Sequence, residues 1–247
     1  MKYQQIGDIF VFKKISKKEA REFMKKFARV KTICARTGKI KGKLRKPQVK
    51  VVVSRAKKDK TIAIHLEDGI RYKIDVSKLM FSKGNMTERH RIARLAKPNE
   101  IVLDMFAGIG YFSLPLAKKV KKVYSIELNP VSYKYLLENI KLNKLNNIGA
   151  IKGDCAEIVP RLKIKADRIM MGYLPSPFKY VSAAFRAARK GAVIHYHCLA
   201  DRNNAGNEIK KLLGRINKIH KVKLLDSVMV KEFSPGKDHY VLDLKVI

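Results

Sequence analysis

Three acidic residues and a glycine-rich turn are the strongest candidates for chemistry in this sequence. Asp104 ends a short apolar run and leads directly into Met105-Phe106-Ala107-Gly108-Ile109-Gly110, while Glu127 and Asp154 end the next two apolar runs. Glycines permit a tight turn and a close approach of the backbone to a ligand. The acids would therefore stand at the carboxyl ends of three successive strands, where open parallel sheets bind their ligands.

The charge of these residues indicates which ligand they suit. Ser113 replaces the third glycine of a dinucleotide fingerprint, so the pyrophosphate-binding pattern is incomplete. Asp104 would oppose a pyrophosphate but suits the cationic sulfonium and amino acid end of S-adenosylmethionine. Glu127 can accept hydrogen bonds from both ribose hydroxyls, and Asp154 suits the adenine amino group.

Each acid alone is also compatible with a helix cap or a solvated turn. Three acids at successive strand ends, with the glycine turn at the first, predict a cofactor site. The residues predicted to line it are Asp104, Phe106, Ala107, Gly108, Gly110, Glu127, Leu128, Asn129, Asp154 and Cys155.

Alternating strands and helices are expected to carry this site. Strand-like runs occupy 100–106, 122–128, 148–154, 166–174 and 191–198, and helical patterns occupy 111–119, 131–142, 176–189 and 203–219. This order predicts a parallel sheet with helices on both faces. Two more runs, 222–233 and 239–247, have no helix between them, so the last strand should be antiparallel. The pattern resembles an α/β class I methyltransferase fold, a Rossmann-like domain with a mostly parallel seven-stranded sheet.

The first third of the chain predicts a smaller α/β domain at residues 1–82, followed by a catalytic domain at residues 83–247. Residues 16–30 have apolar positions at helical spacing, and Ser16 can cap the start of that helix. Runs 46–57, 61–69 and 70–81 are strand-like, with a hairpin turn at 67–69.

The charge of the chain indicates a polyanionic partner. The sequence has 55 Lys and Arg against 21 Asp and Glu, a net charge of +34, and residues 1–60 alone carry 21 against 4. Heat adaptation usually raises Glu together with Lys, and here the acids do not keep pace. Nucleic acid is therefore expected to bind, with helix 16–30 and residues 36–60 contacting its backbone. A plain solvated face is the alternative for these two segments.

Several other function classes do not fit the sequence. No run approaches the roughly 20 apolar residues of a membrane span, and no secretory signal is recognisable, so a cytoplasmic protein, monomeric by default, is expected. Cys34, Cys155 and Cys198 are far apart and form no zinc or disulfide framework. His195 and His197 share a strand face but have no third ligand in view, so no metal is expected and they are predicted to line the core or a pocket.

Taken together, the motifs resemble the archaeal and eukaryotic tRNA family that modifies guanosine 37. The matching stretches are Phe81–Arg89, residues 104–117, Glu127–Pro130 and the tail from Ser234 through His239-Tyr240 to Leu244. The resemblance covers roughly residues 65–247. This family has two branches, an N1-methyltransferase and a wybutosine-pathway aminocarboxypropyltransferase.

Two departures favour the second branch. The methyltransferase branch typically has Ser/Asn-Pro-Arg before a Glu-Arg pair and Asn-Leu-Pro or Asn-Pro-Pro at the fourth strand. This chain has Ser82-Lys83-Gly84-Asn85 and Gly172-Tyr173-Leu174-Pro175 at these places. The resemblance thus implies transfer of the 3-amino-3-carboxypropyl group of S-adenosylmethionine to 4-demethylwyosine at position 37 of tRNA(Phe), with release of methylthioadenosine.

The resemblance also assigns roles to individual residues. Glu88 matches the glutamate proposed as proton acceptor. The alternative interpretation is that Glu88 is an acid in the first turn of a helix, favoured by the helix dipole, after Asn85 or Thr87 as the cap. His239 and Tyr240 match a pair for which a substrate-side role is conceivable. The residues it adds to the cofactor site are Ser82, Asn85, Arg89, Leu174 and Pro175.

Three other functions stay open. They are a guanosine-37 N1-methyltransferase, an rRNA methyltransferase, and a non-catalytic RNA-binding subunit with a Rossmann shell. Such shells usually lose their strand-end acids, whereas this chain keeps Asp104, Glu127 and Asp154.

Overall fold

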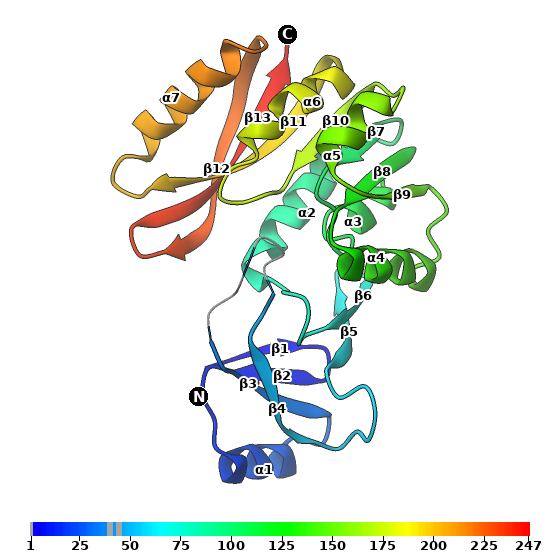
Figure 1. Ribbon diagram of the computed structural model, residues 1–247, viewed down its shortest axis with the longest axis vertical. Coiled ribbons are helices and arrows are strands. Elements are labelled where there is room, and N and C mark those ends of the chain that lie inside the picture. The colour runs from blue at the N-terminus through cyan, green and yellow to red at the C-terminus, as the bar shows by residue number, and fades with distance from the viewer. Residues whose placement is uncertain (1, 39–41, 43–45) are drawn as a thin grey trace. The chain divides into compact units, whose positions relative to one another are not determined.

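The computed structural model describes residues 2–38, 42 and 46–247 of the chain (Figure 1). The chain divides into two compact units, Met1–Ser82 and Lys83–Ile247. Part of the basic segment 36–60, at residues 39–41 and 43–45, lies outside the described residues. In the described part, no helix has the length and apolar character needed to cross a membrane.

The first unit is a four-stranded sheet with one helix and a separate hairpin. The sheet has the order β1-β2-β3-β4, and β5 pairs with β6 in an antiparallel hairpin that confirms the predicted turn. The elements are β1 Tyr3–Ile6, β2 Ile9–Phe12, α1 Lys17–Lys26, β3 Thr32–Arg36, β4 Val49–Ser54, β5 Ile62–Glu67 and β6 Ile70–Asp75. Strands β1 to β3 were not delimited from the sequence, because each has only four or five residues.

Helix α1 starts as predicted but ends earlier than expected. Ser16 forms a capping box with Glu19, which satisfies backbone groups at the first turn. The helix stops at Lys26 because Phe27 adopts an extended conformation. Its apolar face packs on one side of the sheet, against Phe10 and Phe12.

The second unit contains a seven-stranded sheet in the order β12-β13-β11-β10-β7-β8-β9. All neighbouring pairs are parallel except those of β13, which is antiparallel to both β11 and β12. The predicted Rossmann-like fold is confirmed. The strands are β7 Ile101–Asp104, β8 Lys122–Glu127, β9 Ile148–Lys152, β10 Ala166–Met171, β11 Ala188–Asp201, β12 Val222–Ser234 and β13 Lys237–Val246.

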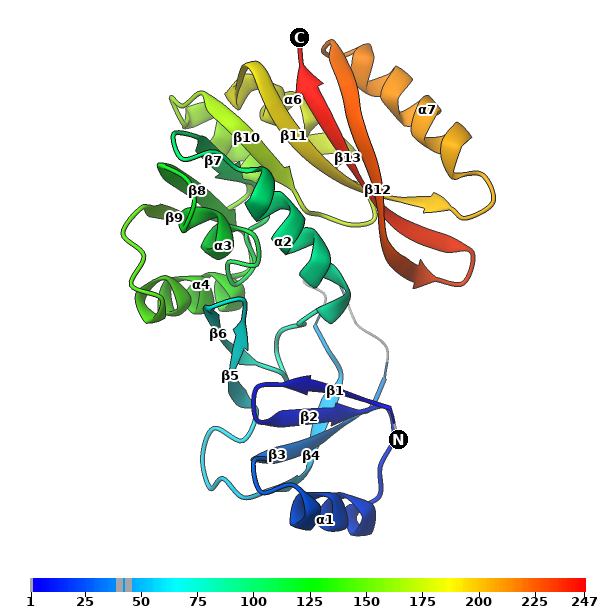
Figure 2. The same ribbon diagram turned by 180° about the vertical axis from the view of Figure 1, so that it is seen from behind.

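Helices cover both faces of this sheet, as Figure 2 shows from behind. The alternation along each strand explains how. Leu103 belongs to the core cluster that includes residues of α6 (Val181–Ala187) and α7 (Ala205–Asn217), whereas the adjacent Val102 belongs to the cluster that includes residues of α2 (Met86–Leu95) and α3 (Ser113–Ala117). The helices are α2 Met86–Leu95, α3 Ser113–Ala117, α4 Pro130–Leu142, α5 Cys155–Ile158, α6 Val181–Ala187 and α7 Ala205–Asn217.

Two predicted helices are shorter than expected. The pattern at 176–189 folds as a 3₁₀ turn at Phe178–Tyr180 followed by α6, and β11 already begins at Ala188. The pattern at 111–119 is reduced to α3, since its first residues complete the turn after Gly110.

Candidate functional site

The carboxyl ends of β7, β8 and β9 are tied together by hydrogen bonds. The Gly108 N–H donates to Oε2 of Glu127 at 2.6 Å, and the Gly153 N–H donates to the Glu127 carbonyl at 3.0 Å. Because these strands are neighbours in the sheet, the glycine turn and two of the predicted acids meet at one edge.

Asp104 is buried at the end of β7 and is held by hydroxyl groups. Ser113 Oγ donates to Asp104 Oδ2 at 2.7 Å, Ser125 Oγ donates to Ser113 Oγ at 2.8 Å, and the Phe106 N–H lies 3.3 Å from Oδ1. Burial raises the pKa of Asp104 to about 6, although the Ser113 hydrogen bond opposes the shift. The site therefore holds a carboxylate that a cationic ligand would favour in its charged form.

Glu127 orders the turn around the site. Its oxygens accept the N–H groups of Gly108 at 2.6 Å and Asn129 at 2.7 Å. Burial raises the pKa of Glu127, and these backbone donors oppose the shift. Since each carboxylate oxygen can accept two hydrogen bonds, capacity for ribose hydroxyls remains. Asn129 itself caps α4 through the Val131 N–H at 2.9 Å.

Asp154 caps the start of α5, which is the alternative role that the sequence allowed for it. Its Oδ1 accepts the Ala156 N–H at 2.8 Å and starts the short helix α5. The neighbouring Cys155 is buried, and burial raises the pKa of its thiol to about 12, so it is a neutral wall residue. Leu128, by contrast, is exposed at the end of β8.

The glycines of the turn have backbone conformations that side chains oppose. Gly108 has φ +59° and Gly110 has φ +98°. A Cβ would stand 2.7 Å from the Tyr111 ring at Gly108 and 2.6 Å from Leu114 Cγ at Gly110. The turn therefore depends on glycine at both positions.

Gly110→Ala should lower the free energy of unfolding by about 1–3 kcal/mol, because the left-handed backbone and the Leu114 contact are both unfavourable. Urea unfolding measures this change. Gly214→Ala is the matched control, since Gly214 lies in α7 with nothing within 4 Å of an added Cβ. That control should gain about 0.5–1 kcal/mol from helix propensity. Equal effects of the two substitutions would contradict this interpretation of the turn.

The segment that follows β10 contributes to an aromatic cluster that the sequence did not reveal. The Tyr173 ring stacks on Phe106 with centroids 5.3 Å apart, and Tyr180 meets Phe106 edge-on at 5.0 Å. Tyr180 precedes α6, so no local spacing links it to Phe106. Beyond the cluster, Leu174 and Pro175 are joined by a cis peptide bond, and the Pro175 carbonyl accepts the Leu199 N–H at 3.2 Å.

Glu88 lies in the first turn of α2, where the structure buries it in an ion pair. Arg91 donates to both Glu88 oxygens at 2.8 Å. The same guanidinium donates to Asp243 on β13 at 2.6 and 3.0 Å. The predicted proton acceptor is thus a strongly held carboxylate in this structure, and its place in the first turn of α2 is also the one that the helix-acid alternative gave it.

The ion pair continues into the sheet through His195. Arg168 can only donate, so His195 Nε2, 2.6 Å away, is the acceptor and Nδ1–H donates to Asp243 at 2.7 Å. Burial lowers the pKa of His195 and favours this neutral form. The Arg168 guanidinium also donates to both carboxylate oxygens of Glu100, at 2.7 and 2.9 Å. We call Glu88, Arg91, Asp243, His195, Arg168 and Glu100 the buried charge network.

The other predicted histidines are also buried in the sheet. His197 Nδ1 lies 3.0 Å from His239 Nε2, and burial lowers the pKa of His197. Tyr240, the neighbour of His239, is half-buried. Across the described residues, no three His, Cys, Asp or Glu side chains gather in a way that could hold a metal ion.

The remaining predicted residues lie at the start of the second unit or just before it. Ser82 ends the first unit, and Asn85 precedes α2 without a capping hydrogen bond from its side chain. Arg89 is buried on α2. Its charge partly opposes the rise that burial causes in the pKa of Tyr111, the residue after Gly110.

Comparisons with known proteins agree on one family. A model described as the TRM5/TYW2 methyltransferase domain matches residues 63–225. A tRNA(Phe) (4-demethylwyosine(37)-C(7)) aminocarboxypropyltransferase of Methanocaldococcus jannaschii is 43% identical over 99% of this chain and 98% of its own length. A tRNA (guanine(37)-N(1))-methyltransferase Trm5b of Pyrococcus abyssi is 36% identical over 88% of this chain and 64% of its own length. The crystal structure of Pyrococcus horikoshii TYW2 in complex with MeSAdo is 33% identical, with a TM-score of 0.84 over 100% of this chain and 90% of that one.

Proposed function

Because the chain belongs to the TRM5/TYW2 methyltransferase family, we propose that it is a tRNA-modifying transferase of the aminocarboxypropyl branch. It moves the 3-amino-3-carboxypropyl group of S-adenosylmethionine to 4-demethylwyosine at position 37 of tRNA(Phe) and releases methylthioadenosine. The observation that carries the choice of branch is the fourth strand end. There Tyr173, stacked on Phe106, stands where the methyltransferase branch has an asparagine.

The strand-end residues fit S-adenosylmethionine. Asp104 provides a buried carboxylate for the cationic end, and Glu127 has acceptor capacity for the ribose. Gly108 and Gly110 let the turn keep its left-handed backbone beside these acids, because a Cβ at either position would meet Tyr111 or Leu114. When bound, the cofactor supplies an alkyl group on a sulfonium whose leaving group is a neutral thioether.

The protein's own residues then select which alkyl group is transferred. In our proposal Ser82, Asn85 and the Leu174–Pro175 loop hold the amino acid arm, so that its methylene carbon bonded to the sulfonium sulfur faces the base. The partly buried Phe106–Tyr173 pair is suited to stacking on the flat, tricyclic acceptor base. Expulsion of a thioether needs no Lewis acid, so the proposed reaction requires no metal.

The acceptor must also lose a proton, and Glu88 remains our candidate for receiving it. The two hydrogen bonds from Arg91 hold the Glu88 carboxylate in place and leave one lone pair on each oxygen as an acceptor.

Glu88→Gln should reduce turnover by about a hundredfold or more if Glu88 is the general base, because such groups contribute roughly 10²–10⁴-fold. The dissociation constant for S-adenosylmethionine should stay within about twofold, since the substitution does not touch the strand-end acids. Single-turnover kinetics and calorimetry measure the two quantities. A variant with near-normal turnover would remove Glu88 from the chemistry and leave it only its place in the buried charge network.

Product analysis tests the function itself. The protein is incubated with S-adenosylmethionine and tRNA(Phe) carrying 4-demethylwyosine, and the nucleoside product is identified by mass spectrometry. Methylthioadenosine is the expected result. S-adenosylhomocysteine would instead show the methyltransferase branch, and the guanosine-37 form of the tRNA would then be the substrate.

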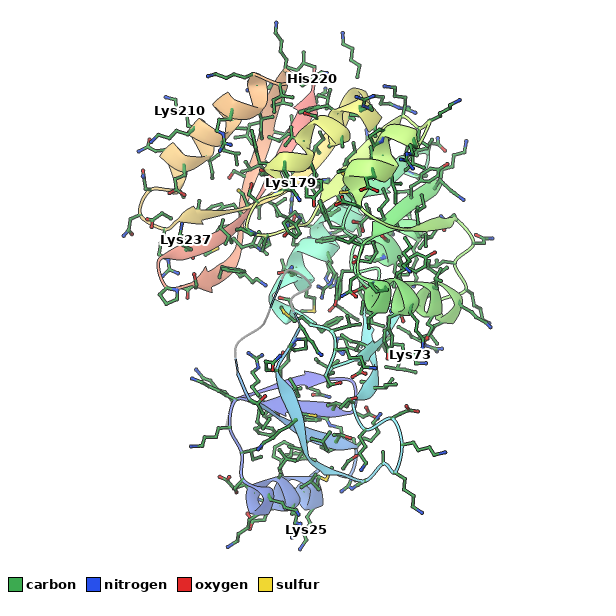
Figure 3. All side chains as sticks on the ribbon, viewed as in Figure 1. Lys25, Lys73, Lys179, Lys210, His220 and Lys237 are labelled. Carbon is green, nitrogen blue, oxygen red and sulfur yellow. The ribbon has the colours of Figure 1, made fainter. Side chains whose placement is uncertain are left out.

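The basic first unit supplies the RNA contacts in this proposal. Lys25 and its neighbours on α1 project away from the sheet, as Figure 3 shows for Lys25. Such side chains suit the phosphate backbone of tRNA. Within the same proposal the protein is a cytoplasmic monomer, and its three buried free cysteines accord with a reducing compartment.

A further inference from the structure

A hollow of about 780 Å³ lies within the first unit and shares no residue with the strand-end site. Its size is in the range of small-molecule pockets, roughly 300–1,000 Å³. Neither the cofactor nor the acceptor base is assigned to it by the proposed function.

The floor of the hollow is the face of the β1–β4 sheet that α1 leaves open. Cross-strand pairing places Gln4 opposite Val11 and Arg36 opposite Val49, so these four side chains share a face. Phe10 and Phe12 alternate with them and point to the α1 side. The floor is therefore an apolar strip with polar residues at one end.

The wall comes from the segment that follows β6, and it is fixed in place. Gln4 Nε2 donates to the Phe81 carbonyl, and Arg36 donates to Gln4 Oε1 at 3.3 Å. The Phe81 ring also packs edge-on against Tyr72 and His65, with centroids 5.5 and 4.7 Å apart. A ligand would thus enter a preformed site, at little cost in ordering the protein.

The rim has the charge that RNA recognition uses. Lys2, Lys13 and Arg36 line the hollow, and its described lining residues include no acid. Tyr3 also borders the hollow, but its ring packs on Phe10 and Phe12 at the α1 side of the sheet. Cations beside an apolar floor suit a phosphate attached to a flat base.

We propose that this hollow is a subsite for one unstacked nucleotide of the RNA substrate. Its base lies over Val11 and Val49, and its phosphate is held by Lys13 and Arg36. The proposal deepens the proposed function and rests on it, since tRNA is the RNA concerned. A protein side chain would satisfy the apolar floor but not the all-basic rim, so the nucleotide is the better occupant.

Filling the hollow without changing charge is the first test. Gln48→Trp places a large side chain on the lining and should raise the dissociation constant of tRNA(Phe) about tenfold by displacing the base. Gln48→Ala is the control and should bind within about twofold of wild type, because it leaves the space open. Affinity is measured by fluorescence anisotropy with the tRNA(Phe) transcript and with its anticodon stem-loop.

Charge reversal provides a second, independent test that a folding defect cannot mimic. Lys13→Glu should weaken RNA binding about tenfold and reduce the salt dependence by about one released ion. Lys14→Glu makes the same charge change at an exposed neighbour outside the lining and should have a clearly smaller effect. Wild-type affinity in both Gln48→Trp and Lys13→Glu, or equal losses in Lys13→Glu and Lys14→Glu, would overturn the subsite.

The tests of the nucleotide subsite and the test of the proposed function can fail independently. If the wild-type protein makes no methylthioadenosine while Gln48→Trp and Lys13→Glu still lose RNA affinity against their controls, the function is wrong and the subsite stands. If methylthioadenosine forms and the variants bind like wild type, the function stands and the subsite is wrong.

Discussion

Asp104→Asn should weaken S-adenosylmethionine binding about a hundredfold, which corresponds to roughly 2.7 kcal/mol. The substitution keeps the shape of the side chain but removes the charge that would pair with the cationic ligand in a buried site, where charge-assisted contacts are strongest. Calorimetry at pH 8 gives the affinity directly. Glu157→Gln is the matched control, because Glu157 is an exposed acid near the same sheet edge and should change the affinity less than twofold.

The pH dependence of binding provides a second measurement of the same residue. Since the pKa of Asp104 is about 6 in the cofactor-free protein, a proton must leave before a cation binds below that pH. The affinity of the wild type should therefore fall up to tenfold per pH unit below about 6, while Asp104→Asn stays flat there. The stability of the cofactor-free fold changes in the opposite direction. Because folding raises the pKa of Asp104, the fold gains stability as pH falls from about 6 toward 3.8. A wild type with pH-independent affinity would separate Asp104 from the cofactor.

The residues that could be predicted from the sequence are those whose environment is local. Asp104 and Glu127 end apolar runs and stand beside turn residues, so their place at a sheet edge follows from neighbours a few positions away. Ser113 was noticed only as a missing glycine, and its hydrogen bond to Asp104 depends on how the turn folds back onto the strand end. Asp154 could equally be read as a cap, and local geometry alone could not separate the two roles.

What could not be predicted depends on partners far apart in the chain. Arg91 and Asp243 are 152 residues apart, and they meet because β13 enters the sheet beside β11, within reach of α2. His195 was expected to be a core or pocket residue, but its two ring partners come from β10 and β13. Periodicity gives the order of elements along the chain, whereas this network needs the order of strands across the sheet.

Arg91→Ala should lower the free energy of unfolding by about 3–5 kcal/mol, because it leaves two buried carboxylates without their common guanidinium. Urea unfolding followed by circular dichroism measures the loss. Arg94→Ala is the matched control, since Arg94 is an exposed arginine on the same helix and should change stability by no more than about 0.5 kcal/mol.

The pH response separates this charge effect from a loss of packing. Burial tends to raise the pKa of Asp243, but hydrogen bonds from His195 and Arg91 hold it below its usual value, so the pair stabilises the fold above the unfolded pKa near 3.8. The difference between wild type and Arg91→Ala should therefore shrink as pH falls below 3.8. Glu88→Gln in the Arg91→Ala background should recover part of the stability, because one of the two unpaired charges is then gone. A difference that is the same at pH 3 and pH 8, with no recovery in the double variant, would mean that Arg91 acts through its packing and that the network does not depend on charge.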